Sequence, residues 1–342
     1  MSSIRGSFVV IGATGLVGRE LISILMEQGV DPSAISAVAS DASVGKVVEL
    51  GGCAFVLQPV REKLFQKDAI VFLCASAELS LQWAPRAVAA GCTVIDCSSA
   101  FRQTDGVPLA IPCVNGELLD SQPSLIAGPN CTTIVLLTAI SPLRKAFAGR
   151  LRSVTVATYQ ALSGAGRDGL DALAAENAGN APVPGGVFPE PCAGNVFCHE
   201  SVVDPASGCS VEEEKVITET HRIWQDDAVQ IAPTCMRVPV ERVHTEAIAL
   251  EFAGDVSEAD VFRVLRASPE VVLVNGPDDG GYPTALKASG GDHVLVGHVR
   301  VQHFAGDNVT RVSLVACGDQ LRTGAALNAV RIAQRLRQVP VT

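Results

Sequence analysis

Cys131 lies in a stretch, Ile126–Thr133, whose residues favour a reactive thiol. An apolar run predicts the end of a strand, a Gly-Pro pair breaks it, and apolar residues at helical spacing follow. Asn130 is a preferred helix N-cap, so Cys131 is expected in the first turn of a helix. The free N–H groups and the positive dipole end found there acidify a thiol and make it a nucleophile. We interpret most of the other cysteines as buried and unreactive.

Arg102 is a candidate ligand for an anion. It ends the run Ser98–Arg102, which directly follows the predicted strand Thr93–Asp96. In open α/β sheets the ligand crevice lies at the carboxyl ends of the strands. For this arginine taken alone, a surface salt bridge is the alternative. The charged run Glu212–Lys215 is by itself typical of the solvated face of a helix.

A glycine-rich turn near the N-terminus is a candidate nucleotide site. The apolar run Phe8–Ile11 predicts a buried strand, and Gly12, Gly15 and Gly18 follow it at the start of a helical pattern that ends at Gln28. A strand, a glycine turn and a helix form the context in which a dinucleotide pyrophosphate binds at a helix N-terminus. A tight turn without a ligand is the alternative.

The elements that position these residues divide the chain into two predicted domains. Predicted strands alternate with helices up to about residue 130, which is the pattern of an α/β fold with a parallel, doubly wound sheet. Strands are expected at residues 8–11, 35–39, 69–74, 92–96 and 124–127, with helices at 16–28 and 79–90. We assign residues 1–130 to a Rossmann-like dinucleotide-binding domain and residues 131–319 to a second domain. A final helix at 320–338 is expected to pack back on the first domain, because a lone terminal helix needs a core.

The second domain is predicted to be α+β, with a mixed, largely antiparallel sheet. Its strands are expected at 151–160, 234–240, 244–252, 271–274, 294–301 and 309–316, and its helices at 170–177 and 211–224. We take 234–240 and 244–252 as successive strands of the antiparallel part. Residues 177–208 are predicted to be loop. Cys192, Cys198, His199 and Cys209 match no metal signature there and are interpreted as structural.

Composition excludes several classes of function. A chain of 342 residues with 48% hydrophobic and 18% charged residues is long enough for two cores. A net charge of −10 and 4% aromatic residues argue against nucleic acid or an anionic membrane as partner. There is no run of about 18 apolar residues and no signal peptide. Eleven scattered cysteines without a C-x-x-C pair indicate reduced thiols in a cytoplasmic enzyme, with no metal.

Taken together, these motifs resemble the aspartate-semialdehyde dehydrogenase family, almost from end to end. The stretches that carry the resemblance are 12–18, 98–102, 128–133, 158–166, Glu212 with Lys215, 237–240 leading to His244, and 321–330. The resemblance implies reversible, NADP-dependent reductive dephosphorylation of L-4-aspartyl phosphate to L-aspartate 4-semialdehyde, in lysine, threonine and methionine biosynthesis. It also implies a homodimer formed through the sheet of the second domain, which would be the catalytic substrate and dimerisation domain.

The resemblance also implies a role for each site residue. Cys131 would form a thioester, His244, with a pKa near 6.5, would act as general acid and base, and Gln160 would orient the acyl group. Arg237 would bind the α-carboxylate and Glu212 the ammonium. The phosphate would lie on Arg102 and Lys215, and Asn130 also belongs to the substrate site. The cofactor residues would be Gly12, Thr14, Gly15, Leu16, Val17, Gly18, Ser40, Ser43, Ser163, Gly164 and Asn328.

The sequence departs from the family where the 2′-phosphate of NADP is expected. Ala42 stands where the family has an arginine, and Asp41 beside it would repel a phosphate, although Ser43 remains. We therefore expect NADP as cofactor, with NAD usable. Glu214 and Cys113 are further departures that we do not explain.

Three alternatives fit these motifs less well. An N-acetyl-γ-glutamyl-phosphate reductase would have no substrate ammonium for Glu212 to pair. A phosphorylating glyceraldehyde-type dehydrogenase would lack the Arg237 clamp. A non-catalytic paralogue acting as a binding protein would not need to keep Cys131, Gln160, Arg237 and His244 together.

Overall fold

The computed structural model describes residues 6–304 and 306–338. The chain forms two compact units, Met1–Pro129 with Ala325–Thr342, and Asn130–Gly324. The predicted first domain includes residues 1–5, which lie outside the described residues.

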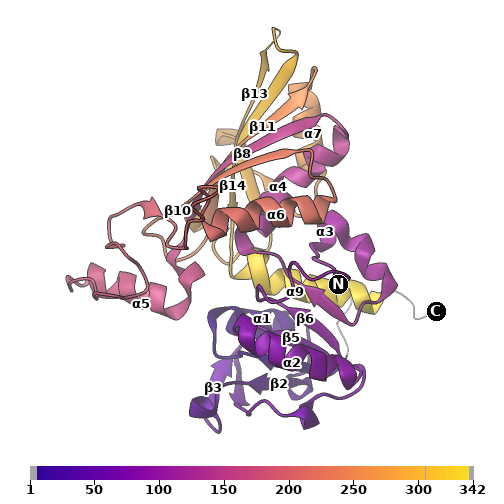
Figure 1. Ribbon diagram of the computed structural model, residues 1–342, viewed down its shortest axis with the longest axis vertical. Coiled ribbons are helices and arrows are strands. Elements are labelled where there is room, and N and C mark those ends of the chain that lie inside the picture. Colours follow the sequence, from indigo (N-terminus) through magenta and orange to yellow (C-terminus); the bar gives the residue numbers. More distant parts are fainter. Residues whose placement is uncertain (1–5, 305, 339–342) are drawn as a thin grey trace. The chain divides into compact units, whose positions relative to one another are not determined.

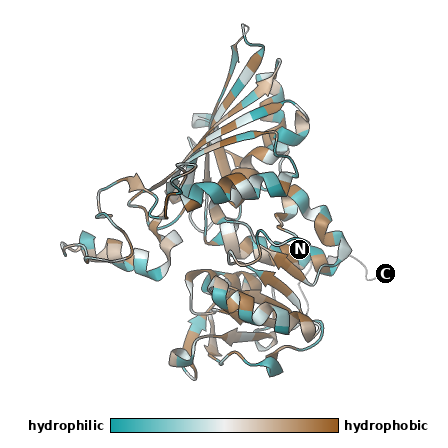
Figure 2. Ribbon diagram, viewed as in Figure 1, coloured by the Kyte–Doolittle hydropathy of each residue, from teal (hydrophilic) through white to brown (hydrophobic). Residues whose placement is uncertain are grey.

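The first unit is built on a parallel sheet, as predicted. Its five strands lie in the order β2-β1-β5-β6-β7, and every pairing between them is parallel. The strands are β1 (Phe8–Ile11), β2 (Ile35–Val38), β5 (Ile70–Leu73), β6 (Thr93–Asp96) and β7 (Leu125–Ala127). Figure 2 shows how hydrophobic these strands are, and β1 and β5 are buried at every position. The sequence did not predict a short antiparallel hairpin that follows β2 in the chain. It consists of β3 (Val47–Leu50) and β4 (Cys53–Val56).

Helices cover both faces of this sheet (Figure 1). Side chains of α1 (Leu16–Glu27) and α9 (Leu327–Gln338) share one core with alternate residues of the strands, such as Phe72 and Ile95. On the other face, Ser80 of α2 (Ala77–Ala89) donates a hydrogen bond to Asp96 of β6. The short α3 (Pro112–Asn115) contacts α9. The helix expected at 320–338 begins as a π-helical turn, Arg322–Ala326, and is α-helical only from Leu327.

The second unit contains a mixed sheet of seven strands in the order β12-β13-β14-β11-β8-β10-β9. The strands are β8 (Leu151–Gln160), β9 (Phe197–Cys198), β10 (Gln230–Arg237), β11 (His244–Ala253), β12 (Val271–Leu273), β13 (Val294–Phe304) and β14 (Val309–Gly318). Most pairings are antiparallel, but β10 runs parallel to β8 and β12 runs parallel to β13.

β10 and β11, expected as successive strands of the antiparallel part, are not neighbours in the sheet, because β8 lies between them and β10 runs parallel to it. The connection between the two strands does not turn back as a tight hairpin. Its carbonyls at Val240 and Glu241 instead accept hydrogen bonds from Leu162 and Ser163, which follow β8. The chain therefore crosses the end of β8 before it re-enters the sheet.

Helices lie on one face of this sheet. α4 (Cys131–Ala146) contacts strands β8, β11, β13 and β14, as well as α6 (Val211–Trp224) and α7 (Glu258–Arg266). α5 (Gly166–Asn177) and α8 (Ala285–Ala288) complete the unit. Along β8, β11 and β14 buried residues alternate with partly exposed ones, so the other face of the sheet stays accessible. Within the described residues, no helix is long and apolar enough to cross a membrane.

Candidate active site

Cys131 is the first residue of α4, as predicted. Asn130 caps this helix, because its side-chain oxygen accepts a hydrogen bond from the N–H of Thr132 at 2.9 Å. No acidic residue lies in the first turn to oppose a thiolate. The Sγ of Cys131 is 3.3 Å from Nε2 of His244. Gly324 packs against Cys131 so closely that a Cβ on this glycine would lie 3.2 Å from the Cys131 Cβ.

His244 opens β11 and is completely buried. Its Nδ1 accepts a hydrogen bond from the backbone N–H of Ala161 at 3.1 Å. A nitrogen that accepts carries no proton, so the proton of the neutral ring lies on Nε2 and faces Cys131. Burial, and then the positive charge of Arg237, lower the pKa of His244 to about 3. This value lies below the 6.5 expected from the residue type, because the sequence could not show this burial.

The residue before His244 has an unusual backbone conformation. Val243 has a φ of +83°, which a β-branched residue rarely adopts. Its N–H donates to Oε1 of Gln320 at 2.7 Å, and Nε2 of the same amide donates to Oγ of Ser163. Gln320 thus ties the start of β11 to the turn that follows β8.

Gln160 and Arg237 are paired residues at the ends of β8 and β10. Nη1 of Arg237 donates to the Gln160 side chain at 3.5 Å and to the carbonyl of Ala161 at 3.2 Å. A Cβ on Gly164 would lie 2.8 Å from Nη1 of Arg237 and 3.5 Å from the His244 ring. Only glycine leaves room for both side chains there, so Gly164 lines this site.

The remaining donors of Arg237 bind a carboxylate that the sequence analysis did not identify. Nε donates to Oε2 of Glu200 at 2.8 Å, and Nη2 donates to Oε1 at 2.6 Å. Nε2 of His199 is 3.8 Å from the same carboxylate. Burial would raise the pKa of Glu200, but hydrogen bonds from Arg237 lower it. Glu200 and His199 both come from the segment 177–208, and His199, interpreted as structural, lies among the charged groups of the site.

Glu212 and Lys215 lie on α6, whose first turn is fixed by a capping box between Ser210 and Glu213. Lys215 Nζ donates to Oε2 of Glu212 at 3.0 Å, and Asn130 Nδ2 donates to Oε1 at 2.9 Å. Burial would raise the pKa of Glu212, but the charge of Lys215 lowers it to about 2. Glu212 is therefore ionised and in contact with the residue that precedes Cys131.

In the first unit, the glycine motif forms the turn from β1 into α1. Gly12 has a φ of +90°, and a Cβ there would lie 2.3 Å from the carbonyl of Cys74. A Cβ on Gly18 would lie 2.2 Å from the Gly12 carbonyl. No side chain caps the N-terminus of α1 at Gly15, and no acid lies in its first turn. This end of the helix, with Thr14, Leu16 and Val17, can receive a phosphate.

The other residues predicted to bind anions or cofactor are held as follows. Arg102 Nε donates to the carbonyls of Ser98 and Gly128, at 3.0 and 2.9 Å. Ser40 occupies the N-cap position of the short helical turn Asp41–Ser43 that follows β2, without a side-chain capping hydrogen bond. The amide of Asn328 donates to the carbonyl of Ala110 at 3.1 Å.

The part of the chain that the structure describes holds no group of three or more His, Cys, Asp or Glu side chains arranged for a metal ion. None of the eleven cysteines, all of which lie in the described part of the chain, forms a disulfide.

Comparisons with known proteins identify relatives over nearly the whole chain. The family profile "Semialdehyde dehydrogenase, NAD binding domain" matches residues 7–122, and "Semialdehyde dehydrogenase, dimerisation domain" matches residues 140–323. The aspartate-semialdehyde dehydrogenase of Shewanella violacea is 38% identical over 338 residues, 96% of each chain. The chain belongs to the aspartate-semialdehyde dehydrogenase family. The Synechocystis member is 36% identical over 333 residues, again 96% of each chain.

A solved structure of the family agrees with this fold. Aspartate semialdehyde dehydrogenase II complexed with ASA, from Vibrio cholerae, superposes with a TM-score of 0.88 at 33% identity over 98% of each chain. The resemblance inferred from the motifs is confirmed, and so are the fold class and the aspartate-semialdehyde dehydrogenase activity expected from it. Glu200 was missed because it lies outside any motif or periodic pattern, and Gln320 was predicted only as the first residue of the final helix.

Proposed function

We propose that this aspartate-semialdehyde dehydrogenase uses Cys131 as its nucleophile in a reversible, NADP-linked reaction. L-4-aspartyl phosphate would be converted to L-aspartate 4-semialdehyde and inorganic phosphate. The observation that carries the proposal is the 3.3 Å approach of the Cys131 thiol, at an unopposed helix N-terminus, to the Nε2–H of His244.

The first half of the reaction exchanges phosphate for sulfur. The thiolate of Cys131 attacks the acyl carbon, the bond from that carbon to the phosphate oxygen breaks, and phosphate leaves. Gln160 orients the acyl group, and backbone N–H groups at the start of α4 stabilise the oxyanion. A thioester on Cys131 remains.

Bound nicotinamide supplies the hydride that reduces this thioester. The resulting oxyanion collapses to the aldehyde and expels the Cys131 thiolate, and the one proton that the overall reaction consumes ends on the released phosphate. A neutral His244 that donates from Nε2 suits this sequence, because it stabilises the thiolate and the oxyanion without itself titrating. We therefore assign His244 as a hydrogen-bond donor in place of the acid–base role expected from its type.

The substrate charges have matching partners in the chain. Arg237 would bind the α-carboxylate as a planar fork, and Glu212, ionised at neutral pH, would bind the α-ammonium. Lys215 and Arg102 would bind the phosphate. Asn130 holds Glu212 in place next to Cys131.

The NAD-binding domain of the family is present. The finer assignment of NADP, with NAD usable, is part of this proposal. The turn Gly12–Gly18 fits a pyrophosphate, because the start of α1 is uncapped and lacks acids. Ser40, Ser43 and Asn328 would complete the site in the first unit. Ser163 and Gly164 are further residues that we propose for cofactor binding.

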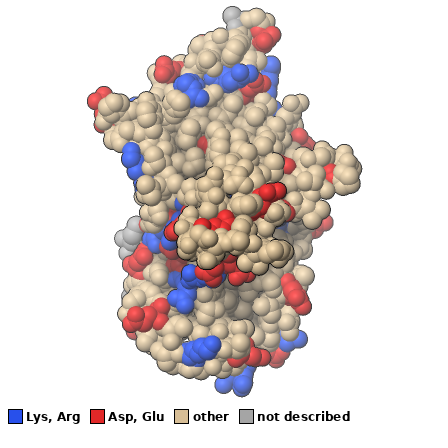
Figure 3. Space-filling view, turned by 90° about the vertical axis from the view of Figure 1, so that its left-hand side faces the viewer, with Lys and Arg blue, Asp and Glu red and all other residues tan. Residues whose placement is uncertain are grey.

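The dimerisation domain of the family is also present. We propose a homodimer formed through the accessible face of the seven-stranded sheet. We expect no nucleic-acid or membrane partner, because the chain carries a net charge of −10. On the one face that Figure 3 shows, Lys and Arg are dispersed among acidic side chains. A cytoplasmic location suits the free thiols.

The test is a phosphate-dependent assay of the purified chain. L-aspartate semialdehyde and NADP should yield NADPH only when phosphate is added. In the opposite direction, L-4-aspartyl phosphate and NADPH should yield L-aspartate semialdehyde and phosphate. Turnover of an N-acetylated glutamyl substrate in preference to the aspartyl one would contradict the proposal.

A further inference from the structure

Arg237, the proposed ligand of the substrate's α-carboxylate, already holds a carboxylate of its own chain. The two parallel hydrogen bonds from Nε and Nη2 to Glu200 measure 2.8 and 2.6 Å, which is the geometry of a bidentate arginine–carboxylate pair. The Nη1 group of Arg237 donates instead to the Gln160 side chain and to the carbonyl of Ala161. A substrate carboxylate that binds Arg237 as a fork must therefore displace Glu200.

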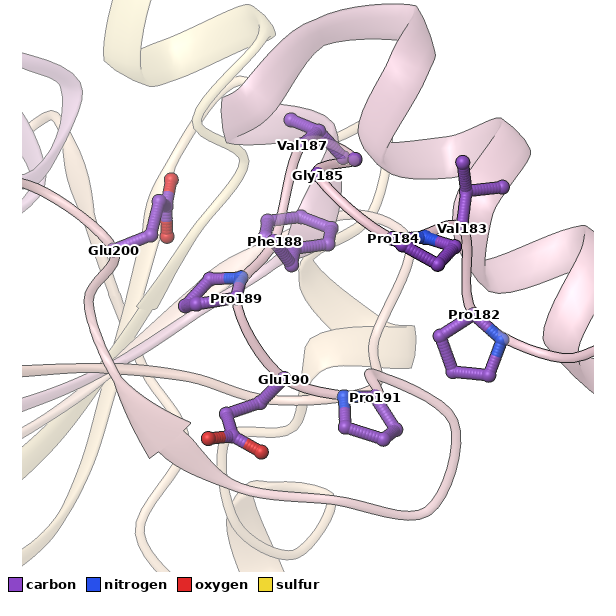
Figure 4. A pocket seen from close by; sticks show the side chains of 11 residues that line it. Pro182, Val183, Pro184, Gly185, Val187, Phe188, Pro189, Glu190, Pro191 and Glu200 are labelled. Carbon is purple, nitrogen blue, oxygen red and sulfur yellow. The ribbon is translucent and has the colours of Figure 1, made fainter.

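The surroundings of Glu200 allow this displacement. The Arg237 side chain is only 4% exposed, whereas that of Glu200 is 19% exposed. Glu200 also lines a pocket of about 440 Å³ formed mainly by the segment Pro182–Pro191. Figure 4 shows Glu200 on one side of this pocket and Pro182 and Pro184 on the other, with Phe188 and Pro189 between. Glu200 therefore has space to move away from the Arg237 guanidinium, whereas Arg237 is held by contacts on several sides.

We propose that Glu200 is a specificity-determining residue that competes with the substrate's α-carboxylate for Arg237. The inference rests on the proposed function, which places that carboxylate on Arg237. A site with a buried, unpaired arginine strongly rejects ligands that lack the carboxylate, because the guanidinium would stay unpaired. Here Glu200 pairs the arginine in the empty site. It therefore weakens binding of α-amino acids and reduces the site's preference for a carboxylate.

The test compares two small probes that differ only in the carboxylate. L-2-Aminobutyrate carries the α-ammonium and α-carboxylate without a reactive group, and 1-propylamine lacks the carboxylate. Each is titrated as a protector of Cys131 against iodoacetamide, with labelling read by mass spectrometry. This readout needs neither cofactor nor turnover.

The Glu200→Gln variant keeps the shape of the side chain but gives a neutral, easily displaced partner. We expect it to bind L-2-aminobutyrate about tenfold more tightly than the wild type, because one charge-assisted competitor is lost. Its affinity for 1-propylamine should stay the same or fall. Glu200→Ala should also bind L-2-aminobutyrate more tightly than the wild type does. This second variant is needed in case the glutamine side chain still bonds to the Arg237 guanidinium. Glu190→Gln is the matched control, because Glu190 lines the same pocket but does not bind Arg237.

Weaker binding of L-2-aminobutyrate by the Glu200 variants would show that Glu200 orients Arg237 for the ligand, and would overturn the proposal. Equal binding by wild type and variants would overturn it as well. The phosphate-dependent assay reports separately on the proposed function. A chain that is inactive with aspartate semialdehyde but shows the shifted probe affinities would refute that function and leave the competition at Arg237 standing.

Discussion

The backbone N–H of Ala161 donates to Nδ1 of His244 at 3.1 Å, on the side of the ring opposite to Cys131. This contact decides which ring nitrogen carries the proton. An imidazolium would carry protons on both nitrogens, and the proton on Nδ1 would then point at the N–H hydrogen of Ala161. The same contact and the burial of the ring keep His244 neutral.

The first prediction is a pH profile without a histidine limb. Because the pKa of His244 is lowered to about 3, kcat should not fall with a midpoint near 6.5 as the pH is reduced from 8 to 5.5. His244→Ala should reduce kcat by about 100- to 1000-fold, the usual effect of removing one donor to a developing oxyanion. His244→Gln, which retains an N–H, should lose less. If kcat of the wild type does fall at low pH with a midpoint near 6.5, and this fall is absent in His244→Gln, then His244 acts as an acid–base catalyst.

The nucleophile can be tested without reference to the substrate. Cys131→Ala should abolish turnover while leaving the fold and nucleotide binding intact, and Cys131→Ser should be nearly as inactive because a hydroxyl is far less ionised. Iodoacetamide should label Cys131 ahead of the other cysteines. Cys113 is an informative comparison, since it is exposed and also lies in the first turn of a short helix. Faster labelling of Cys113 than of Cys131 would count against an activated thiol.

The two proposed anion sites should separate kinetically. Arg237→Lys keeps the charge but loses the planar fork, so kcat/KM for L-aspartate semialdehyde should fall by about tenfold or more. Arg102→Ala should mainly raise the KM for phosphate. Circular dichroism controls for folding, because Arg102 also bonds two backbone carbonyls. Identical effects of the two variants on both substrates would refute the separate roles.

How much of the site could be foreseen depends on whether its determinants are local. The position of Cys131 at the start of α4 follows from neighbouring residues, because the strand end, the Gly-Pro break and the Asn130 cap lie within one short stretch. The glycine turn into α1 is local in the same way. Both were therefore predicted from the sequence.

Contacts between distant segments could not be foreseen. Glu200 reaches Arg237 from a loop without periodicity, and Gln320 reaches Val243 from beyond the last strand. The parallel pairing of β10 with β8 depends on a connection that crosses the sheet end, and no residue type marks that path. The low pKa of His244 follows from burial by all these segments together.

Glu246, two residues after His244, predicts a pH dependence of stability. It is completely buried, and neither carboxylate oxygen has a hydrogen-bond partner in the described part of the chain. Burial raises its pKa well above the usual 4.5. The folded chain then keeps a proton that the unfolded chain releases above pH 4.5, so the free energy of unfolding falls as pH rises through this window, by up to about 1.4 kcal/mol per unit.

Replacing Glu246 with Met should remove this slope and raise the free energy of unfolding at pH 8, measured by urea denaturation. Glu251→Gln on the same strand is the contrasting control. The pKa of Glu251 is lowered by its hydrogen bond with Arg311, so its contribution is present at neutral pH and is lost as the medium becomes acidic. A Glu246→Met variant that is less stable than the wild type at pH 8 would show that the carboxyl group is stabilising.

We expect the cofactor preference to depend on the turn Asp41–Ser43 after β2. Both Asp41 and Ala42 are exposed there. An arginine in place of Ala42 would add charge-assisted hydrogen bonds to a 2′-phosphate, worth about 1.5–3 kcal/mol or roughly one to two decades of preference. Asp41 can instead accept hydrogen bonds from the ribose hydroxyls of NAD, as acidic residues do in NAD-specific Rossmann sites. Lys46 and Ser43 still offer donors to the phosphate. We therefore expect weak discrimination, with both cofactors used.

The measurement is kcat/KM with NADP and with NAD for the wild type and for Ala42→Arg. The arginine should raise the preference for NADP by about ten- to hundredfold, and Asp41→Asn should shift it in the same direction by removing the repulsive charge. Neither change should alter the KM for L-aspartate semialdehyde, which serves as the internal control. If the wild type already favours NADP by three decades and the arginine adds nothing, the 2′-phosphate is bound by residues other than this turn.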